Sequence, residues 1–299
     1  MIAAIVILFH PNKNTLNKLL LSIERQVDEI IVVDNTEVQA YAASDFQKFS
    51  HLTYHPLNTN VGIAKAQNIG IALAIQKNCS HVLLLDQDSC LEPQVVSTLL
   101  NKEKELLERG FSVAAIGPIY LEIKTGKYTR AVRQKYLEYA SIPLSPNTNE
   151  LVEADFIIAS GSVIRTSVIE HVGLMKECLF IDGVDIEWCY RAKSMGYSTF
   201  ITSATAMTHS IGDAYIELFG KPIMIHSDLR NRYIIRNSCY FFRLNHVTTW
   251  WKITSMIKIP CYVVIYTLHS SRKTAHFFSL IISAMNGFLG RLGKINTRS

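Results

Sequence analysis

At Val82-Leu83-Leu84-Leu85-Asp86-Gln87-Asp88, a short apolar run ends in two carboxylates one residue apart. The run has the length and hydrophobicity of a strand that is covered on both faces. In open α/β sheets, ligands bind at the carboxyl ends of the strands, which is where Asp86 and Asp88 follow. Two such carboxylates repel each other unless a cation or hydrogen-bond donors neutralise them, and Mg²⁺ or Mn²⁺ suits carboxylates together with phosphate oxygens. The alternative is an Asx-type turn that only ends the strand.

Apolar runs alternate with helical patterns through the first half of the chain. We expect strands at 3–9, 30–33, 82–85, 113–119 and 157–164, and helices at 16–23, 63–75 and 93–107. Such alternation predicts an α/β fold with a mixed, mostly parallel sheet and helices on both faces. The polar segment 120–149 is predicted to be irregular and partly mobile, because it carries two prolines and little periodicity. The opening apolar run has no basic leader and no cleavage site, so it is interpreted as a first strand.

Composition and charge limit the function classes. The 299 residues are 48% hydrophobic and 18% charged, as in a folded globular protein. Six scattered cysteines with no Cys-x-x-Cys pair argue against a zinc site and a disulfide framework, and they indicate a reducing cytoplasm. The net charge of +5 is uneven, because residues 229–299 hold eleven Arg and Lys and no Asp or Glu. We therefore divide the chain into a mildly acidic unit at 1–228, which contains the carboxylate pair, and a basic C-terminal region at 229–299 that favours a polyanionic partner.

The C-terminal region is predicted to be helical at 230–244 and 249–259, followed by apolar runs at 261–268 and 277–289 that Pro260 helps to separate. Each run is shorter than the roughly 20 apolar residues of a membrane-spanning helix. Basic residues together with aromatic ones fit helices that lie in a membrane interface. The aromatic residues are Trp250, Trp251, Tyr262, Tyr266, Phe277 and Phe278. Ordinary packed helices or an oligomer contact are the alternatives, and nucleic acid is disfavoured because long apolar runs replace dispersed polar side chains.

Two further motifs lie near the predicted strand ends. Asp34 follows the strand at 30–33 and could accept hydrogen bonds from a base or a ribose, or could cap the next element. The second motif is Asn58-x-Asn60-x-Gly62-x-Ala64-Lys65-Ala66-x-Asn68-x-Gly70. Its glycine permits a tight turn, and its small residues allow close approach to a helix N-terminus, which favours phosphate.

The last two motifs carry acids and a histidine. At 180–191, Asp182, Asp185 and Glu187 surround the start of a helix beside Trp188. These acids could simply stabilise the helix dipole, or they could supply a general base and a platform for a sugar ring. In Thr208-His209-Ser210-Ile211-Gly212-Asp213, the imidazole is either structural or a third ligand beside the carboxylate pair.

In this order the segments resemble the family 2 glycosyltransferases of the GT-A fold, over about residues 2–240. The family's acidic helix start often reads Glu-Asp-x-Asp-x-x-x-Arg, with its second acid as catalytic base. Counting back six residues from Arg191 gives that role to Asp185. Val184 replaces the usual Glu, which leaves Asp182 as a rival base.

The resemblance is closer to bacterial rhamnosyltransferases of O-antigen and other lipopolysaccharide synthesis, because residues 180–192 and 226–237 look like their sequences. It implies inverting transfer of L-rhamnose from dTDP-L-rhamnose to a saccharide acceptor carried on polyprenyl diphosphate. A UDP- or GDP-linked donor is one alternative, and a non-catalytic membrane-peripheral scaffold is another. A nucleotidyltransferase is disfavoured, because Phe9-His10-Pro11-Asn12 lacks the glycines of a triphosphate loop.

The resemblance also implies roles for individual residues. The nucleotide would be bound by Phe9, Asp34, Lys65, Asn68 and Asp86. A divalent cation, Mn²⁺ or Mg²⁺, would be held by Asp86, Asp88 and His209. The sugars would contact Asp182, Glu187 and Trp188. Arg230 and Arg236 would bind a diphosphate of donor or acceptor, or would equally well serve as membrane-surface charge. The basic region would hold the enzyme at the inner face of the cytoplasmic membrane.

Overall fold

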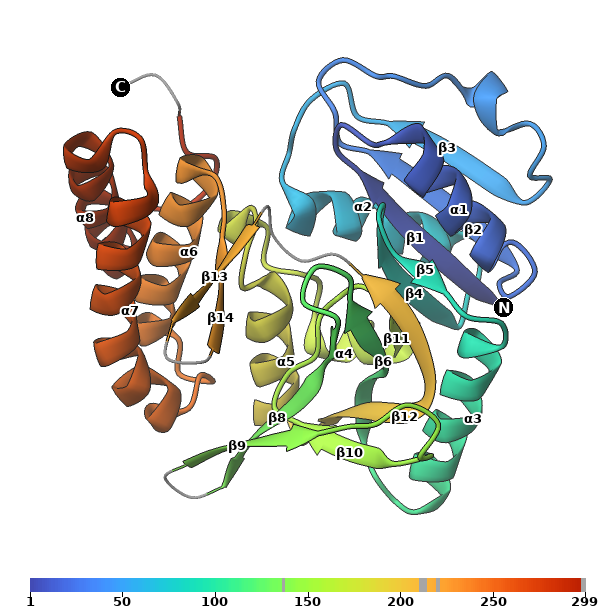
Figure 1. The fold of residues 1–299 in the computed structure, drawn as a ribbon. Coiled ribbons are helices and arrows are strands. Elements are labelled where there is room, and N and C mark those ends of the chain that lie inside the picture. The colour runs from blue at the N-terminus through green and yellow to red at the C-terminus, as the bar shows by residue number, and fades with distance from the viewer. Residues whose placement is uncertain (136–137, 210–213, 219–220, 297–299) are drawn as a thin grey trace.

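The computed structural model describes residues 1–135, 138–209, 214–218 and 221–296. Its centre is a mixed, mostly parallel sheet (Figure 1). The spatial order is β10 (Leu151–Ala154), β12 (Ser198–His209), β6 (Val113–Glu122), β11 (Ser162–Arg165), β4 (His81–Asp86), β1 (Ile2–Leu8), β2 (Glu29–Asp34) and β3 (Leu52–Pro56). Two short strands, β5 (Cys90–Leu91) and β7 (Lys127–Tyr128), pair with β12 and β6. Among the described strands of this sheet, β10, β11 and these two short strands run antiparallel to their neighbours.

Helices cover both faces of the sheet. One face is covered by α1 (Lys13–Ile23) and α3 (Val95–Glu108), and the other by α2 (Ile63–Gln76), α4 (Thr166–Val172) and α5 (Val184–Ser194). Along β1, Ile5 and Ile7 contact the second group of helices, whereas Val6 and Leu8 contact the first. Strands buried on both faces are continuously apolar, which explains the runs in the sequence. The predicted fold class is therefore confirmed.

The strand expected at 157–164 is shorter than predicted. β11 begins only at Ser162, because residues 157–161 form a loop beside the end of β4, where Gly161 N–H donates to the Leu84 carbonyl at 2.8 Å. Gly161 has φ +83°, and a Cβ there would lie 2.5 Å from Met207 Sδ. This close approach requires glycine and ends the ladder.

The prediction of irregular structure at 120–149 is wrong. β6 continues to Glu122, and β8 (Arg130–Lys135) pairs with β9 (Glu138–Pro143) as an antiparallel hairpin. The Arg130 side chain donates from Nε and Nη2 to the hydroxyl and carbonyl oxygens of Ser141, both at 2.7 Å. Cross-strand polar contacts of this kind stabilise a hairpin without apolar alternation, so the sequence pattern does not reveal it.

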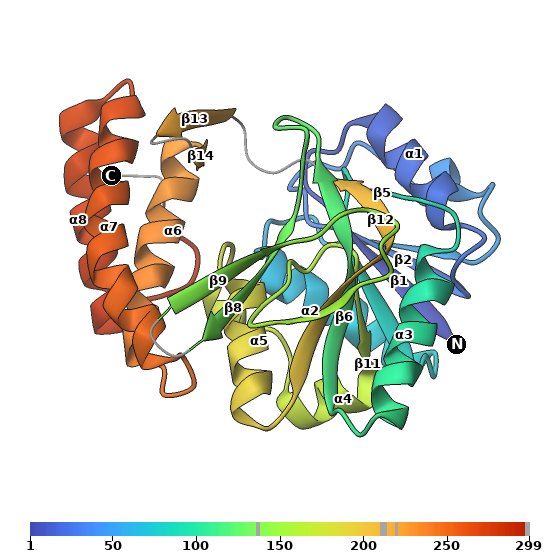
Figure 2. The ribbon, with the colours of Figure 1, turned by 60° about the horizontal axis from the view of Figure 1, so that its bottom comes forward.

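The C-terminal helices α6 (Asp228–Tyr240), α7 (Thr249–His269) and α8 (Lys273–Leu289) lie side by side at one end of the molecule (Figures 1 and 2). The small hairpin β13 (Ala214–Leu218) and β14 (Lys221–Ile225) precedes them. The described residues also form the 3-10 turns η1 (Ala43–Phe46), η2 (Glu177–Leu179) and η3 (Phe241–Arg243), the last directly after α6. α7 continues through Pro260, contrary to the expected break, because Ser255 before it and Val263 after it are both buried. Within the described ranges, no helix has the length and hydrophobicity to cross a membrane.

Candidate active site

Three strand ends meet at the carboxyl edge of the sheet. β1, β2 and β4 are parallel, and their register sets Leu8 beside Asp34 and Ile7 beside Asp86. β12 is parallel to β6, so His209 at its end reaches the same edge. The topology therefore brings together residues that are up to 175 positions apart in the sequence. They lie at the carboxyl ends of the strands, where open α/β sheets bind ligands.

Asp86, Asp88 and His209 form a cluster at this edge. His209 Nε2 lies 3.7 Å from Asp86 Oδ2, and Nδ1 lies 3.5 Å from Asp88 Oδ1. One ligand atom from each residue falls within 4.8 Å of the others. Two carboxylates and one imidazole at this spacing fit a divalent cation such as Mn²⁺ or Mg²⁺. Residues 210–213, which complete the histidine motif, lie outside the described residues.

Neighbouring side chains hold this cluster in place. Gln87, between the two acids, accepts from Phe9 N–H at 2.8 Å and donates to the Phe9 carbonyl at 3.0 Å. The Asp86 N–H donates to Ser160 Oγ at 3.1 Å, and Ser89 Oγ lies 2.7 Å from Ser160 Oγ and 3.1 Å from His209 Nδ1. The sequence interpretation missed both serines. The small-residue stretch at 159–162 was the available signal, because it is typical of a tight loop rather than of a strand.

The electrostatics of Asp86 reflect this crowding. Burial raises the pKa of its carboxyl above the ordinary value, and the neighbouring Asp88 adds to the increase, whereas His209 and Arg230 oppose it. The positive neighbours do not compensate fully for lost solvation and like-charge repulsion. A cation between the carboxylates would relieve both effects.

Asp185 lies in the first turn of α5, which begins after Gly183 at φ +76°. Its Oδ1 accepts from Ile186 N–H at 2.9 Å. Burial raises the pKa of Asp185 to about 6, and the charges of Asp86 and Asp182 add to this shift against the opposing backbone hydrogen bond. A carboxylate with such a pKa is suited to accept a proton near neutral pH.

Asp182 has a different environment. Arg230 Nε and Nη2 both donate to Asp182 Oδ1 at 3.0 Å, and Nε also lies 3.2 Å from Oδ2. A forked contact of this kind stabilises the ionised carboxylate and occupies its oxygens. The two rival bases are thus distinguished by their partners, a guanidinium for Asp182 and one backbone N–H for Asp185.

The structure does not bring Glu187 and Trp188 to the surface of the site. Trp188 is 1% exposed, and its indole N–H donates to the Gly173 carbonyl at 2.8 Å. Glu187 is fully buried and pairs with Arg191 at 3.0 Å and His246 at 3.0 Å. Burial tends to raise the pKa of Glu187, but the hydrogen bonds from His246 and Arg191 lower it overall. Both side chains serve the packing of α5 in this structure, so the prediction that they contact a sugar is corrected.

The predicted nucleotide residues divide into two groups. Phe9 and Lys65 are exposed. Asp34 is fully buried and accepts from Tyr54 Oη at 2.8 Å and Thr36 N–H at 3.0 Å. The Asn68 amide is 5% exposed and exchanges two 2.9 Å hydrogen bonds with the Met175 backbone. The polar atoms of the second pair are therefore engaged within the protein.

Arg236 is 2% exposed. It donates to the carbonyls of Leu179 at 3.0 Å and Gly293 at 2.5 Å, and its guanidinium lies 4.8 Å from the Tyr233 ring centre. The enclosed group reaches neither a diphosphate nor a membrane surface here, so both predicted roles of Arg236 are corrected. The sequence alone does not reveal that Arg236 is buried, because arginine side chains are ordinarily exposed.

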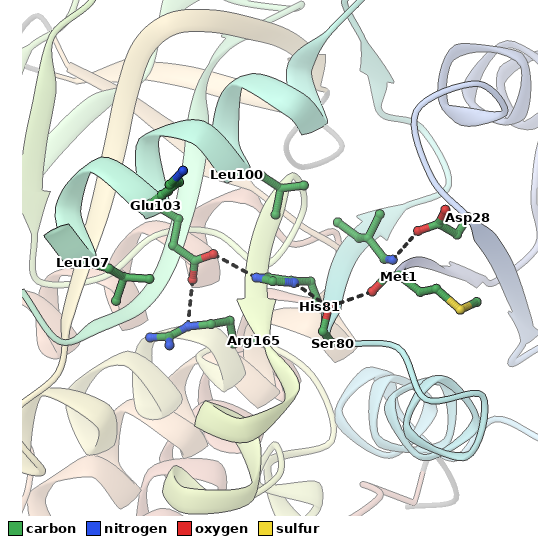
Figure 3. Close-up of a pocket in the computed structure, with 10 residues that line it drawn as sticks. Met1, Asp28, Ser80, His81, Leu100, Glu103, Leu107 and Arg165 are labelled. Carbon is green, nitrogen blue, oxygen red and sulfur yellow. Dashed lines mark hydrogen bonds and ion pairs between the residues drawn. The ribbon is translucent and has the colours of Figure 1, made fainter.

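A second charged cluster lies at the opposite edge of the sheet, where β4 begins. Glu103 is 3% exposed, and its two oxygens lie 2.9 Å from His81 Nε2 and 3.0 Å from Arg165 Nε. The cluster lines a cavity of about 400 Å³ together with Leu100 and Leu107, as Figure 3 shows. This cavity is separate from the carboxylate pair of the other edge.

Comparisons with known proteins agree with this geometry. The chain is 28% identical over 98% of its length to dTDP-rhamnosyl transferase RfbF of Shigella flexneri, covering 97% of that protein. The structure of GalNAc-T7 with UDP, GalNAc and Mn²⁺ is similar with a TM-score of 0.59 and 12% identity, covering 87% of this chain and 54% of that one. S. aureus TarS 1–349 in complex with UDP-GlcNAc gives a TM-score of 0.57 and 14% identity, covering 97% and 82%.

These two structures show the fold alone, and it is the fold predicted from the sequence. A family model described as Glycosyl transferase family 2 matches residues 4–173, which is more than half of the chain. The matched part contains the strand ends that carry Asp34, Asp86 and Asp88. The chain belongs to glycosyl transferase family 2.

Proposed function

We propose that the protein is an inverting, metal-dependent glycosyltransferase that moves L-rhamnose from dTDP-L-rhamnose to a saccharide. The observation that carries the proposal is the pairing of the Asp86–Asp88–His209 cluster with the nearby proton acceptor Asp185. Support for the donor comes from the near full-length similarity to a dTDP-rhamnosyl transferase. The acceptor we propose is a polyprenyl-diphosphate-linked saccharide of bacterial surface polysaccharide synthesis, such as O-antigen.

Transfer with inversion is a single displacement. The oxygen of an acceptor hydroxyl bonds to the anomeric carbon from the face opposite the diphosphate, and the bond from that carbon to the diphosphate oxygen breaks with its electron pair. The hydroxyl proton passes to the Asp185 carboxylate. Asp185 is favoured over Asp182 because, among the residues that the structure describes, its carboxylate is bound by a backbone N–H rather than by a guanidinium such as that of Arg230.

Asp86, Asp88 and His209 would hold the divalent cation, which when bound neutralises charge on the departing dTDP. Phe9 and Lys65 are the better supported nucleotide contacts, because their side chains are exposed. Asp34 and Asn68 would need to release internal hydrogen bonds to reach a ligand. Arg230 lies near enough to influence Asp86, so it remains a candidate contact for the diphosphate.

Calorimetric titration with a panel of nucleotide sugars tests this function. The panel contains dTDP-rhamnose, UDP-sugars and GDP-sugars, each with Mn²⁺, with Mg²⁺ and with EDTA. We expect selective, cation-dependent binding of dTDP-rhamnose that is lost in Asp88→Ala and kept in Val38→Ser, a control at an exposed side chain of the β2–β3 connection. Preference for UDP- or GDP-sugars would overturn the donor, and absence of binding to all of them would favour a non-catalytic scaffold.

We further propose that the C-terminal region binds an anionic membrane surface. Twelve large apolar side chains of α7 and α8 are exposed, and the region 229–299 contains no acidic residue. The exposed apolar residues are Ile253, Met256, Ile257, Val264, Leu268, Phe277, Phe278, Ile281, Ile282, Met285, Phe288 and Leu289. An apolar face on a basic helical layer is complementary to the interface of a bilayer with anionic headgroups. This contact would hold the enzyme at the inner face of the cytoplasmic membrane, where a lipid-linked acceptor lies.

Sedimentation with phosphatidylglycerol-containing vesicles tests the membrane contact. The double variant Ile257→Ser with Phe278→Ser should lose most vesicle binding, whereas the matched control Val38→Ser, 81% exposed elsewhere, should retain it. Unchanged binding of the double variant would contradict the proposal. A stable dimer in solution that the double variant dissociates would assign the same face to a second copy of the chain. Substitutions are preferable to truncation, because α7 and α8 also cover the inner side of α6.

A further inference from the structure

The loop that leads into α5 has an unusual backbone. Phe180 and Asp182 have φ of +69° and +65°, and Gly183 follows with φ +76°. Side chains other than glycine rarely adopt this left-handed region, so the surrounding structure must hold the loop in this conformation. Asp185 lies two residues after Gly183, so the position of its side chain depends on these dihedral angles.

Asn237 of α6 donates hydrogen bonds to three backbone carbonyls of this loop. Its Nδ2 lies 3.0, 2.7 and 2.9 Å from the carbonyl oxygens of Leu179, Ile181 and Asp182. Its Oδ1 accepts from Arg236 Nε at 3.0 Å, and Arg236 Nη2 donates to Leu179 O at 3.0 Å. Asn237 and Arg236 are each 2% exposed. Asn237 and Arg236 together thus supply hydrogen bonds to the carbonyls of Leu179, Ile181 and Asp182 within this chain reversal.

The same loop is fixed from its other side. The Phe180 ring stacks on Tyr233 of α6 with a centroid distance of 5.1 Å and an interplanar angle of 10°. Its carbonyl accepts from Ala64 N–H at 3.4 Å, and a Cβ on Gly62 would lie 2.6 Å from the Phe180 ring. The loop is therefore clamped between α6 and the start of α2, with little space for an alternative path.

We propose that Asn237, braced by Arg236, is a positioning residue for glycosyl transfer: it fixes the backbone at 179–183 and thereby directs Asp185 toward the reacting hydroxyl. This inference rests on the proposed function, in which Asp185 is the base. Both side chains are buried, so they act on the loop at 179–183 rather than on a diphosphate.

The brace extends into the C-terminal helices. Arg236 Nη1 donates to the Gly293 carbonyl at 2.5 Å, and a Cβ on Gly287 of α8 would lie 2.1 Å from the Arg236 carbonyl oxygen. α8 therefore packs directly against the backbone of the residue that supports Asn237. It follows that α8 and the residues after it support the Asn237 brace in addition to the proposed membrane contact.

The test compares Asn237→Ala and Arg236→Lys with the control Asn245→Ala. Asn245 is an exposed asparagine in the connection between η3 and α7. The probe reaction is Mn²⁺-dependent hydrolysis of dTDP-rhamnose, in which water replaces the acceptor and released dTDP is measured. We expect kcat to fall about tenfold or more in Asn237→Ala and less in Arg236→Lys, with the donor Kd within about twofold of the parent. The control should match the parent in both.

Hydrogen exchange separates positioning from general destabilisation. In Asn237→Ala the amides of residues 180–186 should exchange faster, while those of β1 and β4 keep the parent's protection. Unchanged kcat despite faster exchange would overturn the proposal, and so would a loss of protection across the whole sheet in both variants. If Asn237→Ala does not fold, Arg236→Lys decides by the same readouts.

The exchange measurement needs no donor, so it also separates this inference from the proposed function. Faster exchange at 180–186 together with full turnover in Asp185→Asn would refute the base assignment. Unchanged exchange together with an inactive Asp185→Asn would refute only the role of Asn237.

Discussion

The two edges of the central sheet each carry a cluster of acids and histidine, and the clusters differ in how their charges are paired. At the amino edge, Glu103 has a histidine on one oxygen and an arginine on the other, both within 3.0 Å. At the carboxyl edge, Asp86 and Asp88 share one histidine at 3.7 and 3.5 Å, and burial together with the charge of Asp88 raises the pKa of Asp86. The first cluster is electrostatically complete, and the second is not.

This difference indicates where function lies. A buried carboxylate with two close partners contributes to the folded state and has no capacity for a ligand. Acids that lack sufficient partners destabilise the free protein but are ready to bind a cation and a diphosphate. The cavity of about 400 Å³ beside Glu103 is lined by this paired cluster, so the presence of a cavity does not by itself mark the site.

The largest effect is expected at the proton acceptor. Asp185→Asn keeps the shape of the side chain but removes its ability to take a proton, so turnover should fall about 10³-fold with donor affinity nearly unchanged. Initial rates and calorimetry measure the two quantities. The control is Glu103→Gln at the paired cluster, whose rate per folded molecule should equal that of the parent. Normal turnover in Asp185→Asn would remove this residue from the mechanism.

We expect substitutions in the two clusters to change the free energy of unfolding in opposite directions. Glu103→Gln breaks a buried charged pair and should lower the free energy of unfolding by about 3 kcal/mol. Asp86→Asn removes one of two repelling carboxylates and should raise it by about 0.5 kcal/mol in EDTA. Urea denaturation measures both. A loss of stability in both variants would show that the carboxyl-edge acids are paired after all.

A smaller effect is expected from pH. Asp185 must be ionised to accept a proton, and its pKa is raised to about 6. The rate should therefore be nearly constant above pH 7 and fall about tenfold per pH unit below 6, as the carboxylate becomes protonated. A pH–rate profile of dTDP release at saturating Mn²⁺ checks this. An acid limb near pH 4 would mean that the base is a more solvated carboxylate.

The sheet and the carboxylate edge could be predicted from the sequence, because strands covered on both faces have a continuous apolar pattern. Asp86, Asp88 and His209 were identified together, since a strand end followed by acids points to the carboxyl edge. The β8–β9 hairpin could not be predicted, because polar cross-strand contacts such as Arg130 with Ser141 leave no periodic signal.

The burial of particular polar and aromatic side chains also could not be predicted from the sequence. Trp188 and Arg236 have the residue types expected for sugar and diphosphate, yet tertiary packing encloses both. Asn237 lies within the segment 226–237 that resembles rhamnosyltransferases, but its three carbonyl partners lie 55 to 58 residues away in the sequence and are brought to it only by the fold. Side-chain direction is determined by contacts that a single sequence does not specify.

Electron paramagnetic resonance of Mn²⁺ shows whether the carboxyl-edge cluster of Asp86, Asp88 and His209 binds the cation, because the signal distinguishes free from bound Mn²⁺. Mn²⁺ is titrated into the parent, Asp88→Ala and Glu103→Gln in the presence of dTDP. We expect one bound ion per chain in the parent and in Glu103→Gln, and a large loss of binding in Asp88→Ala. Equal binding in all three proteins, or binding lost only in Glu103→Gln, would contradict the assignment of the cation to Asp86, Asp88 and His209.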